Sequence, residues 1–320
     1  MEEHSPSTAV TFAAQVRSVP GGEHLDLCYS CGTCVSRCLI QQKLEPEYNP
    51  RRLLHMVMMD MREDAYQSPT TWLCSACDLC YPACPQQIHI SSLIGAVKSL
   101  AVQDGRVSPL ETVQVDETLC SGCAICVMSC PYEAPHLINK EVNGVVDRFS
   151  EVDASKCMGC GICVAACPMG AIARPGVANA DILAQMKIKK QKDVPSLVVF
   201  ICDWSLRADE DVALLETFPA NVRVIHIPCS GRIDPQLALY ALAGGIDGVL
   251  VCGCQPGECH FKRGNYVSQC KISLLDQMLG QMETAQGRVR FIQLGTQERG
   301  RIRLEVEGML HNLALLREVR

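Results

Sequence analysis

Four cysteine runs of one spacing constrain this chain more than any other feature of its sequence. Each run follows the pattern C-x2-C-x2-C-x3-C, and the runs begin at Cys28, Cys74, Cys120 and Cys157. Thiolates at this spacing are typical ligands of [4Fe–4S] clusters, because the short loop wraps closely around a cube of iron and sulfide. Gly122 suits such a loop, since glycine reaches positive φ without a Cβ penalty. The sequence therefore predicts iron–sulfur chemistry.

The composition limits the cellular compartment and the class of protein to which these thiols can belong. The chain has 320 residues, enough for two to three domains, and contains 22 cysteines. A secreted disulfide scaffold would be short and would not repeat one spacing four times, so metal-bound thiolates in a reducing compartment are favoured. We find no secretory signal and no apolar run near the roughly 20 residues that span a bilayer. We therefore expect a cytoplasmic, soluble protein, and the net charge of −6 argues against a nucleic-acid partner.

The first two runs are separated by a helical pattern. Residues 1–24 are polar and are expected to form a flexible tail. Asn49 and Pro50 suit the N-cap and first position of a helix, and apolar residues then recur at helical spacing. A second helix is expected over 91–102. The first part of the chain is therefore predicted to be mostly helical, with a joint at 104–109.

The third and fourth runs lie in a different context. Residues 113–116 and 142–146 are expected to form short strands in hairpins, with Asn143 and Gly144 at a turn. This pattern is typical of an α+β ferredoxin. The sequence thus indicates two kinds of ferredoxin placed one after the other.

Beyond Pro175, strands and helices alternate. A linker helix over 180–192 leads to apolar strands that indicate a parallel sheet covered on both faces. The strands are expected at 196–202, 221–227, 248–251 and 289–294. The helices are expected at 209–218, 235–243, 266–279 and 300–316.

Four further cysteines follow strands of this expected sheet. Sites in open parallel sheets form beyond the carboxyl ends of the strands, which is where Cys202, Cys229, Cys254 and Cys259 fall. Four thiolates can hold a [2Fe–2S] cluster or a zinc ion, and the neighbouring iron–sulfur runs favour the cluster. Two more cysteines are expected in the core rather than as ligands: Cys252 and Cys270.

With the motifs placed, residues 115–175 resemble the two-[4Fe–4S] ferredoxins, in which the fourth cysteine of each run binds the other cluster. The resemblance implies ligand sets that cross between runs. In the middle ferredoxin these are Cys120, Cys123, Cys126 and Cys167, and Cys157, Cys160, Cys163 and Cys130. In the helical ferredoxin they are Cys28, Cys31, Cys34 and Cys84, and Cys74, Cys77, Cys80 and Cys38.

Residues 28–101 resemble the HdrC subunit of heterodisulfide reductase and the helical ferredoxins of related dehydrogenases. The two runs and the segment Trp72-Leu-Cys74-Ser-Ala-Cys77 carry this resemblance. The chain departs from the pattern at Leu39, where a proline usually follows the fourth cysteine. The departure concerns the geometry of the loop rather than ligation.

Residues 196–318 resemble the delta subunit of methyl-viologen-reducing hydrogenase (MvhD). The resemblance rests on Cys202-Asp-Trp204, on Pro228-Cys-Ser-Gly-Arg232, and on Cys254-x4-Cys259-His260 followed by Gly264 and Asn265. Ser205 stands where that family commonly has another cysteine. The family implies an electron relay from a hydrogenase or formate dehydrogenase to HdrA, the flavin-containing subunit of heterodisulfide reductase, or to a relative of HdrA.

Together these features predict a multidomain α+β and α/β protein that binds four [4Fe–4S] clusters and one [2Fe–2S] cluster. The expected domains are a helical ferredoxin at 25–104, a βαβ-type ferredoxin at 110–176, a linker at 177–194 and a flavodoxin-like or Rossmann-like domain at 195–320. The expected function is electron transfer in a hetero-oligomeric, anaerobic complex, without a substrate site of its own. Two alternatives remain open: a thiol/disulfide oxidoreductase using Cys254 and Cys259, and a zinc-stabilised docking module attached to a ferredoxin.

Overall fold

A computed structural model describes residues 10–142, 144–188, 194–206, 213, 215–282, 286–295, 298 and 300–318. The chain divides into two compact units, Met1–Leu110 and Glu111–Arg320, and the division directly follows the joint expected at 104–109. Each unit is described by itself. Among the described residues, no helix combines the length and apolarity needed to cross a bilayer.

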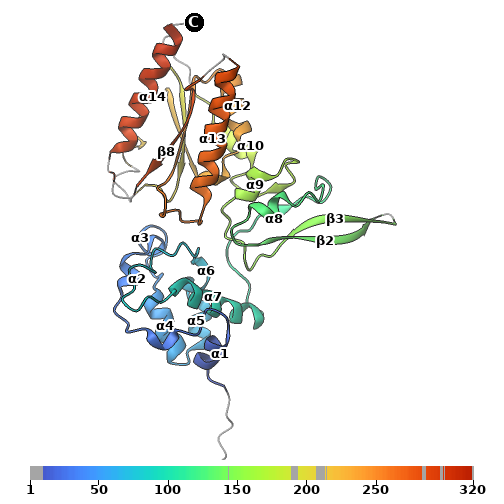
Figure 1. The fold of residues 1–320 in the computed structure, drawn as a ribbon, viewed down its shortest axis with the longest axis vertical. Helices are drawn as coiled ribbons and strands as arrows, with labels where there is room; N and C mark the ends of the chain where they lie inside the picture. Colours follow the sequence, from blue (N-terminus) through green and yellow to red (C-terminus); the bar gives the residue numbers. More distant parts are fainter. Residues whose placement is uncertain are drawn as a thin grey trace, which may run out of the picture. The chain divides into compact units, whose positions relative to one another are not determined.

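The first unit is built from helices, as the sequence predicts (Figure 1). Several of its helices are short, and some of these short helices lie beside the cysteine runs. In chain order the elements are α1 (Phe12–Ser18), η1 (Leu25–Leu27), α2 (Thr33–Ser36), α3 (Leu39–Lys43), α4 (Pro50–Met58), α5 (Arg62–Gln67), α6 (Pro69–Leu73) and α7 (Ile90–Gln103).

Helix α4 shows how local sequence sets an element of this unit. The Asn49 side chain accepts a hydrogen bond of 3.0 Å from the Arg52 amide, and Pro50 occupies the first helical position. Leu53, Leu54 and Val57 then lie fully buried on one face and pack with α7 in the core of the unit. The predicted N-cap and apolar face of this helix are confirmed.

The expectation of a flexible tail over residues 1–24 is wrong for its second half. Residues 12–18 form α1, and Phe12 and Val16 are buried in the same core as α4 and α7. The Phe12 ring meets the Tyr66 ring edge to face at 5.5 Å. The polar flanks and the Pro and Gly residues obscured a short apolar face that the core needs. Residues 1–9 lie outside the described part of the chain.

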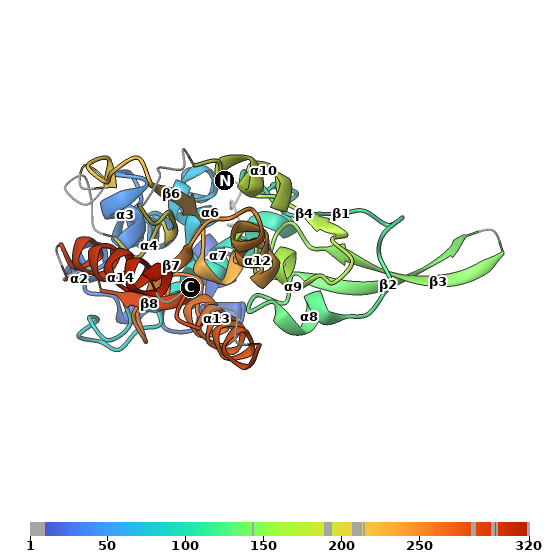
Figure 2. The ribbon, with the colours of Figure 1, turned by 90° about the horizontal axis from the view of Figure 1, so that it is seen from above.

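The second unit begins with a small α+β part. Strand β1 (Gln114–Val115) pairs antiparallel with β4 (Ile172–Ala173), and β2 (Pro135–Val142) pairs antiparallel with β3 (Val145–Val152). The hairpin of β2 and β3 is longer than the strands expected from the sequence, and it extends well beyond helices α8 (Ile125–Ser129) and α9 (Ile162–Ala166) (Figure 2).

A four-stranded parallel sheet forms the rest of this unit, with the strand order β6-β5-β7-β8. Helices α12 and α13 cover one face with the short helix α10, and α14 covers the other (Figure 1). The elements are α10 (Asn179–Gln185), β5 (Leu197–Cys202), β6 (Val222–Ile227), η2 (Ser230–Arg232), α12 (Pro235–Ala243), β7 (Gly248–Cys254), α13 (Gly264–Gln281), β8 (Val289–Leu294) and α14 (Arg301–Glu318).

This arrangement confirms the expected mixture of ferredoxin-like parts and a parallel sheet. All six residues of β5 are buried, as expected for a central strand covered on both faces. The linker helix is shorter than expected, since α10 ends at Gln185. Residues 189–193 and most of the helix expected at 209–218 lie outside the described residues.

Candidate iron–sulfur sites

The four cysteine runs share one backbone conformation. In each run, the residue before and the residue after the second cysteine have positive φ angles between 50° and 83°. The eight residues are Ser30 and Gly32, Ala76 and Asp78, Gly122 and Ala124, and Gly159 and Gly161. The same conformation therefore recurs whether or not glycine is present.

This conformation suits an anionic group inside the loop. A left-handed residue next to a right-handed one turns successive backbone N–H groups into one concavity, which favours negative charge. Holding Ala76, Asp78 or Ala124 in the left-handed region costs of order 1–3 kcal/mol each, and such strain persists where the surroundings impose it. The shared loop geometry is what binding to a cluster of iron and sulfide requires.

The residues after the fourth cysteine separate one run from the other three. In the three runs that end in Cys-Pro, the third residue past the cysteine again has positive φ; these residues are Gln87, Glu133 and Gly170. After Cys38 the chain instead enters helix α3 at Leu39. The missing proline is thus accompanied by a different loop exit, while Cys38 keeps its place near the other cysteines.

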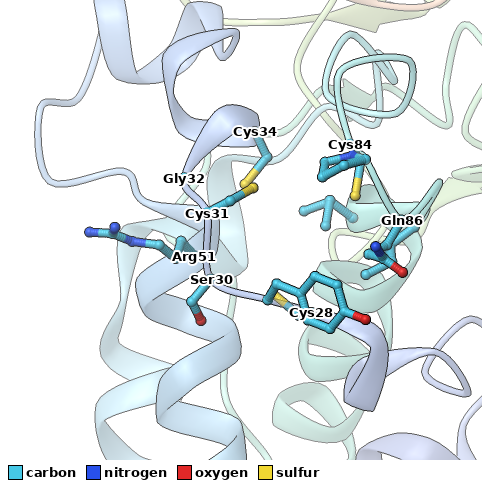
Figure 3. Close-up of a pocket in the computed structure, with 12 residues that line it drawn as sticks. Cys28, Ser30, Cys31, Gly32, Cys34, Arg51, Cys84 and Gln86 are labelled. Carbon is cyan, nitrogen blue, oxygen red and sulfur yellow. The ribbon is translucent and has the colours of Figure 1, made fainter.

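In the first unit, the two runs bring their cysteines together across the sequence. Cys28, Cys31, Cys34 and Cys84 line one pocket, and Figure 3 shows the sulfurs of the first run and of Cys84 facing the same space. Three of these cysteines come from the first run and one from the second, which is the grouping that the two-cluster ferredoxin pattern predicts.

The other four cysteines of this unit lie near one another, and Cys38, Cys74 and Cys80 lie near Tyr48. Burial raises the pKa values of Cys38, Cys74 and Cys77, and neighbouring thiolates in this group raise them further. The Tyr48 hydroxyl hydrogen-bonds to the sulfurs of Cys38 and Cys74 and favours their thiolate forms. Tyr48 is 2% exposed, and no motif in the sequence pointed to it.

The second unit repeats the arrangement. Cys130, Cys157, Cys160 and Cys163 line one pocket, so the last cysteine of the third run joins the fourth run. Near the remaining set, Ser150 of β3 donates its amide to Cys120 Sγ at 3.5 Å, and its hydroxyl lies 3.2 Å from Cys126 Sγ.

The thiol chemistry of these pockets fits iron–sulfur clusters. Burial raises the pKa of Cys34 to about 11 and that of Cys160 to about 12, and nearby thiolates add to both shifts. Four sulfurs held this close cannot all ionise unless positive charge lies among them. Iron supplies that charge and makes the deprotonated ligands favourable.

The C-terminal sheet brings its four cysteines to one edge, as expected. Cys202 ends β5, Cys254 ends β7, and the other two lie in the loops after β6 and β7. All four are at most 6% exposed. Their sulfurs form a closed ring in which each thiol hydrogen-bonds to two others, in the order Cys202, Cys229, Cys259 and Cys254.

The hydrogen bonds within this ring shift the pKa values of its four thiols in alternating directions. Donation from Cys229 and Cys254 lowers the pKa values of Cys202 and Cys259, while the pKa values of the two donors are raised. Backbone amides also point at the two thiolates, including that of Asn265 at the start of the 18-residue helix α13. A helix N-terminus favours negative charge, so it stabilises thiolates at this edge of the sheet. Such thiolates can bind a cationic group.

Gly264 is required by this packing. A Cβ at this position would lie 2.1 Å from Cys229 Sγ, which no side chain can accommodate without moving the sulfur or the helix. The next residue, Asn265, is fully buried, and its side-chain amide donates hydrogen bonds to the backbone carbonyls of Cys254 and Gln255. Together they fix the start of α13 against the ring.

The other residues singled out in the sequence have varied surroundings. Trp204 packs against the ring and stacks on His260, with ring centroids 3.4 Å apart. Ser205 is buried and donates its hydroxyl to the carbonyl of Cys202. Cys252 is a core residue, as expected, but Cys270 is exposed on α13, so its expected core position is wrong.

Within the described ranges, no group of three or more Cys, His, Asp or Glu side chains is arranged so that it could hold a single metal ion.

Comparison with known proteins finds matches to three segments of the chain. Three family models match: a 4Fe-4S dicluster domain at residues 24–88, a second 4Fe-4S dicluster domain at 119–172, and, at 197–316, the delta subunit of methyl-viologen-reducing hydrogenase. Over 98 residues, 30% of its length, the chain is 39% identical to an iron-sulfur subunit of the F420-non-reducing hydrogenase of Archaeoglobus profundus, and it covers 72% of that protein. The chain belongs to the methyl-viologen-reducing hydrogenase delta-subunit family.

Two further relatives extend the similarity of this delta-subunit family member. It is 34% identical over 132 residues, 40% of its length, to the HdrA subunit of the ferredoxin:CoB-CoM heterodisulfide reductase of Methanosarcina mazei, but it covers only 17% of that protein. It is 24% identical over 98 residues, 31% of its length, to the HdrC subunit of the H2:CoB-CoM heterodisulfide,ferredoxin reductase of Methanothermobacter marburgensis, of which it covers 51%. The domain of the delta-subunit family is therefore joined here to two 4Fe-4S dicluster domains in one chain.

Proposed function

We propose that this chain is an electron-transfer subunit that carries four [4Fe–4S] clusters and one [2Fe–2S] cluster. Single electrons pass between its two dicluster ferredoxins and the C-terminal domain, in a direction that its partners determine. The protein buries the clusters, sets their spacing and adjusts their potentials through hydrogen bonds and charge. It has no catalytic residue of its own.

The observation that carries this proposal is the gathering of cysteines from separate runs. The pocket of Cys28, Cys31, Cys34 and Cys84 and the pocket of Cys130, Cys157, Cys160 and Cys163 both match the crossed ligand sets. We assign the remaining run cysteines to two further [4Fe–4S] clusters and the C-terminal ring to the [2Fe–2S] cluster. The three matched family models support the proposed three-domain order of helical ferredoxin, βαβ-type ferredoxin and flavodoxin-like domain.

The proposed partners follow from the relatives. One partner is an HdrA-like flavoprotein, and the other is a hydrogenase, a formate dehydrogenase or another redox enzyme that supplies or accepts electrons. Isolation of the native complex under strict anaerobiosis, followed by metal and flavin analysis, tests this assignment. We expect iron, sulfide and co-purifying flavin, with nickel, molybdenum or tungsten identifying the second enzyme. A lone chain without flavin or a second metal would contradict the proposed partners.

A thiol/disulfide oxidoreductase using Cys254 and Cys259 is the second candidate. The lowered pKa of Cys259, which results from hydrogen bonds donated by Cys229 and Cys254, favours a nucleophilic thiolate. However, the two sulfurs belong to residues only 3% and 6% exposed, which restricts access by a disulfide substrate. Alkylation of the iron-free chain decides between the candidates: rapid, paired modification of these two cysteines would favour the enzyme.

A further inference from the structure

The second unit contains a buried junction between its ferredoxin part and its C-terminal sheet. Cys160 and Cys229, which belong to two different candidate sites, lie in one apolar cluster with Ile162 and Phe261. Ile162 is fully buried, and a Cβ on Gly231 would lie 2.9 Å from its side chain. The two cysteine sites therefore meet across packed side chains rather than across solvent.

Three cations of the C-terminal part cross this junction, and each donates to a backbone carbonyl of the ferredoxin part or of the segment that follows it. Arg263 bonds to the carbonyls of Met128 and Ser129 at the end of α8, and Lys271 bonds to that of Ala165 at the end of α9. Terminal carbonyls of helices have no partners within the helix, and cations there are favourable.

Arg232 is the third cation and the most deeply buried, at 0% exposure. Its Nε donates to the carbonyl of Val177 and its Nη2 to Asn179 Oδ1, both at 2.7 Å. Its stem lies against Gly161 in the fourth cysteine run, where a Cβ would be 2.6 Å from Arg232 Cδ. Among the residues that the structure describes, its buried Nη1 finds no hydrogen-bond partner, which is costly for a charged group.

The charge of Arg232 persists despite this burial. Burial lowers its pKa to about 10, while Asp234, Cys163 and Asp181 oppose that shift, so the guanidinium remains protonated at neutral pH. An unpartnered buried cation next to a cysteine run is favourable where a negative charge is bound nearby. Clusters with four thiolate ligands carry net negative charge, and reduction adds one more.

We propose that Arg232 is a positioning residue that locks the Cys130/Cys157/Cys160/Cys163 site against the C-terminal ring and stabilises the reduced state of the cluster there. It acts through its buried positive charge and its two hydrogen bonds rather than as a ligand. The inference rests on the proposed iron–sulfur function and goes beyond it by naming the residue that couples two of the clusters.

The test compares Arg232→Met and Arg232→Lys in the full-length, anaerobically reconstituted chain. Iron and sulfide per chain are measured first, and a wild-type chain without clusters would refute the proposed function itself. EPR-monitored redox titration then gives midpoint potentials and the spin–spin coupling between reduced clusters. Arg263→Met is the matched control, because it removes hydrogen bonds to Met128 and Ser129 across the same junction from an exposed side chain.

With clusters intact, we expect Arg232→Met to lower the ratio of reduced to oxidised cluster about tenfold at one [4Fe–4S] centre, measured at a fixed potential. This change corresponds to a midpoint potential that is lower by about 59 mV for one electron. Arg232→Lys should keep most of the potential but weaken the coupling, because a compact ammonium does not reproduce the forked geometry in which two guanidinium nitrogens hold Val177 and Asn179. Arg263→Met should change neither. Unchanged potential and coupling in Arg232→Met would overturn the proposal. If Arg232→Met loses iron, the test rests on Arg232→Lys. Spin–spin coupling in Arg232→Lys equal to that of the wild type would then overturn the positioning role.

Discussion

Tyr48 shows how one side chain can act on the group that a cysteine run holds. Its buried hydroxyl hydrogen-bonds to the sulfurs of Cys38 and Cys74. Hydrogen bonds to ligand sulfurs stabilise the more negative, reduced form of a cluster. The hydroxyl should therefore raise the reduction potential of the cluster assigned to Cys38, Cys74, Cys77 and Cys80.

We predict that Tyr48→Phe lowers that potential. The lost stabilisation of the reduced form is about 1 kcal/mol, or roughly 40 mV for one electron. EPR-monitored titration of the full chain measures the shift. Tyr81→Phe is the control, because Tyr81 lies in the second cysteine run next to Cys80 and stacks its ring on His89. Equal potentials in Tyr48→Phe and the wild type would show that the hydroxyl does not act on the cluster.

Gly264 gives a second prediction at this scale. Because a Cβ would meet Cys229 Sγ at 2.1 Å, Gly264→Ala should abolish metal binding at the C-terminal ring and leave the [4Fe–4S] sites intact. Iron analysis and EPR of the variant should show loss of the [2Fe–2S] signal alone. Gly308→Ala provides the control, since no atom of the described residues lies within 4 Å of a Cβ there. A full [2Fe–2S] signal in Gly264→Ala would mean that this glycine is not required.

How far single residues were predictable depended on whether they belong to a motif. The crossed cysteine pairing is what the resemblance to two-cluster ferredoxins implies, and two pockets of the structure each hold cysteines from two runs. Tyr48 and Ser150 were not predicted, because each reaches a sulfur through tertiary packing from a distant part of the chain. No local periodicity or spacing marks such contacts.

At the scale of elements, predictability followed the strength of local signals. Helix α4 was predictable because its cap and apolar face agree, and α12 has the predicted bounds of 235–243. Helices α2 and α3 were not, since they are single turns that the cysteine loops impose. The hairpin of β2 and β3 was expected to be short, because its charged residues hide the alternation that marks a strand.

Asp247 ties three elements of the sheet together. Its carboxylate accepts bonds from the amide and hydroxyl of Ser196, before β5, and from Arg317 near the end of α14. Burial raises its pKa, but the hydrogen bonds from Arg317 and Ser196 outweigh burial and hold that pKa below its usual value. Because the folded-state pKa is depressed, this stabilisation is complete at neutral pH and is lost only as the pH falls through that lowered value.

We predict that Asp247→Asn destabilises the sheet by about 1–3 kcal/mol at neutral pH. Native-state hydrogen exchange in β5 and β7 should accelerate about fivefold to 150-fold. Asp276→Asn serves as the control, since Asp276 accepts a single bond from the Gly287 amide at an exposed position. Unchanged exchange in Asp247→Asn would show that the three-element contact contributes no stability.

At the scale of the whole molecule, the candidate sites differ in exposure. Cys31 and Cys123 are exposed, whereas all four cysteines of the C-terminal ring are buried. Oxidants reach exposed thiolate ligands first, and cluster loss follows. The chain should therefore lose its clusters in a defined order.

On exposure to air, we expect the sites containing Cys31 and Cys123 to lose iron before the C-terminal site does. Time-resolved EPR of the reduced chain, with released iron measured in parallel, follows the order. The [2Fe–2S] signal should be the last to disappear. Its loss before that of the [4Fe–4S] signals would contradict the link between exposure and lability.

The central claim is that one chain joins five one-electron centres. The most direct measurement is a reductive titration of the anaerobically purified full chain, with iron, sulfide and EPR spins counted on the same sample. We predict about 18 iron atoms and about 18 sulfides per chain, and about five electrons taken up, with one centre of the [2Fe–2S] type. A chain that held about 16 iron atoms together with one zinc ion and accepted only four electrons would contradict this claim, because the C-terminal site would then carry no electron.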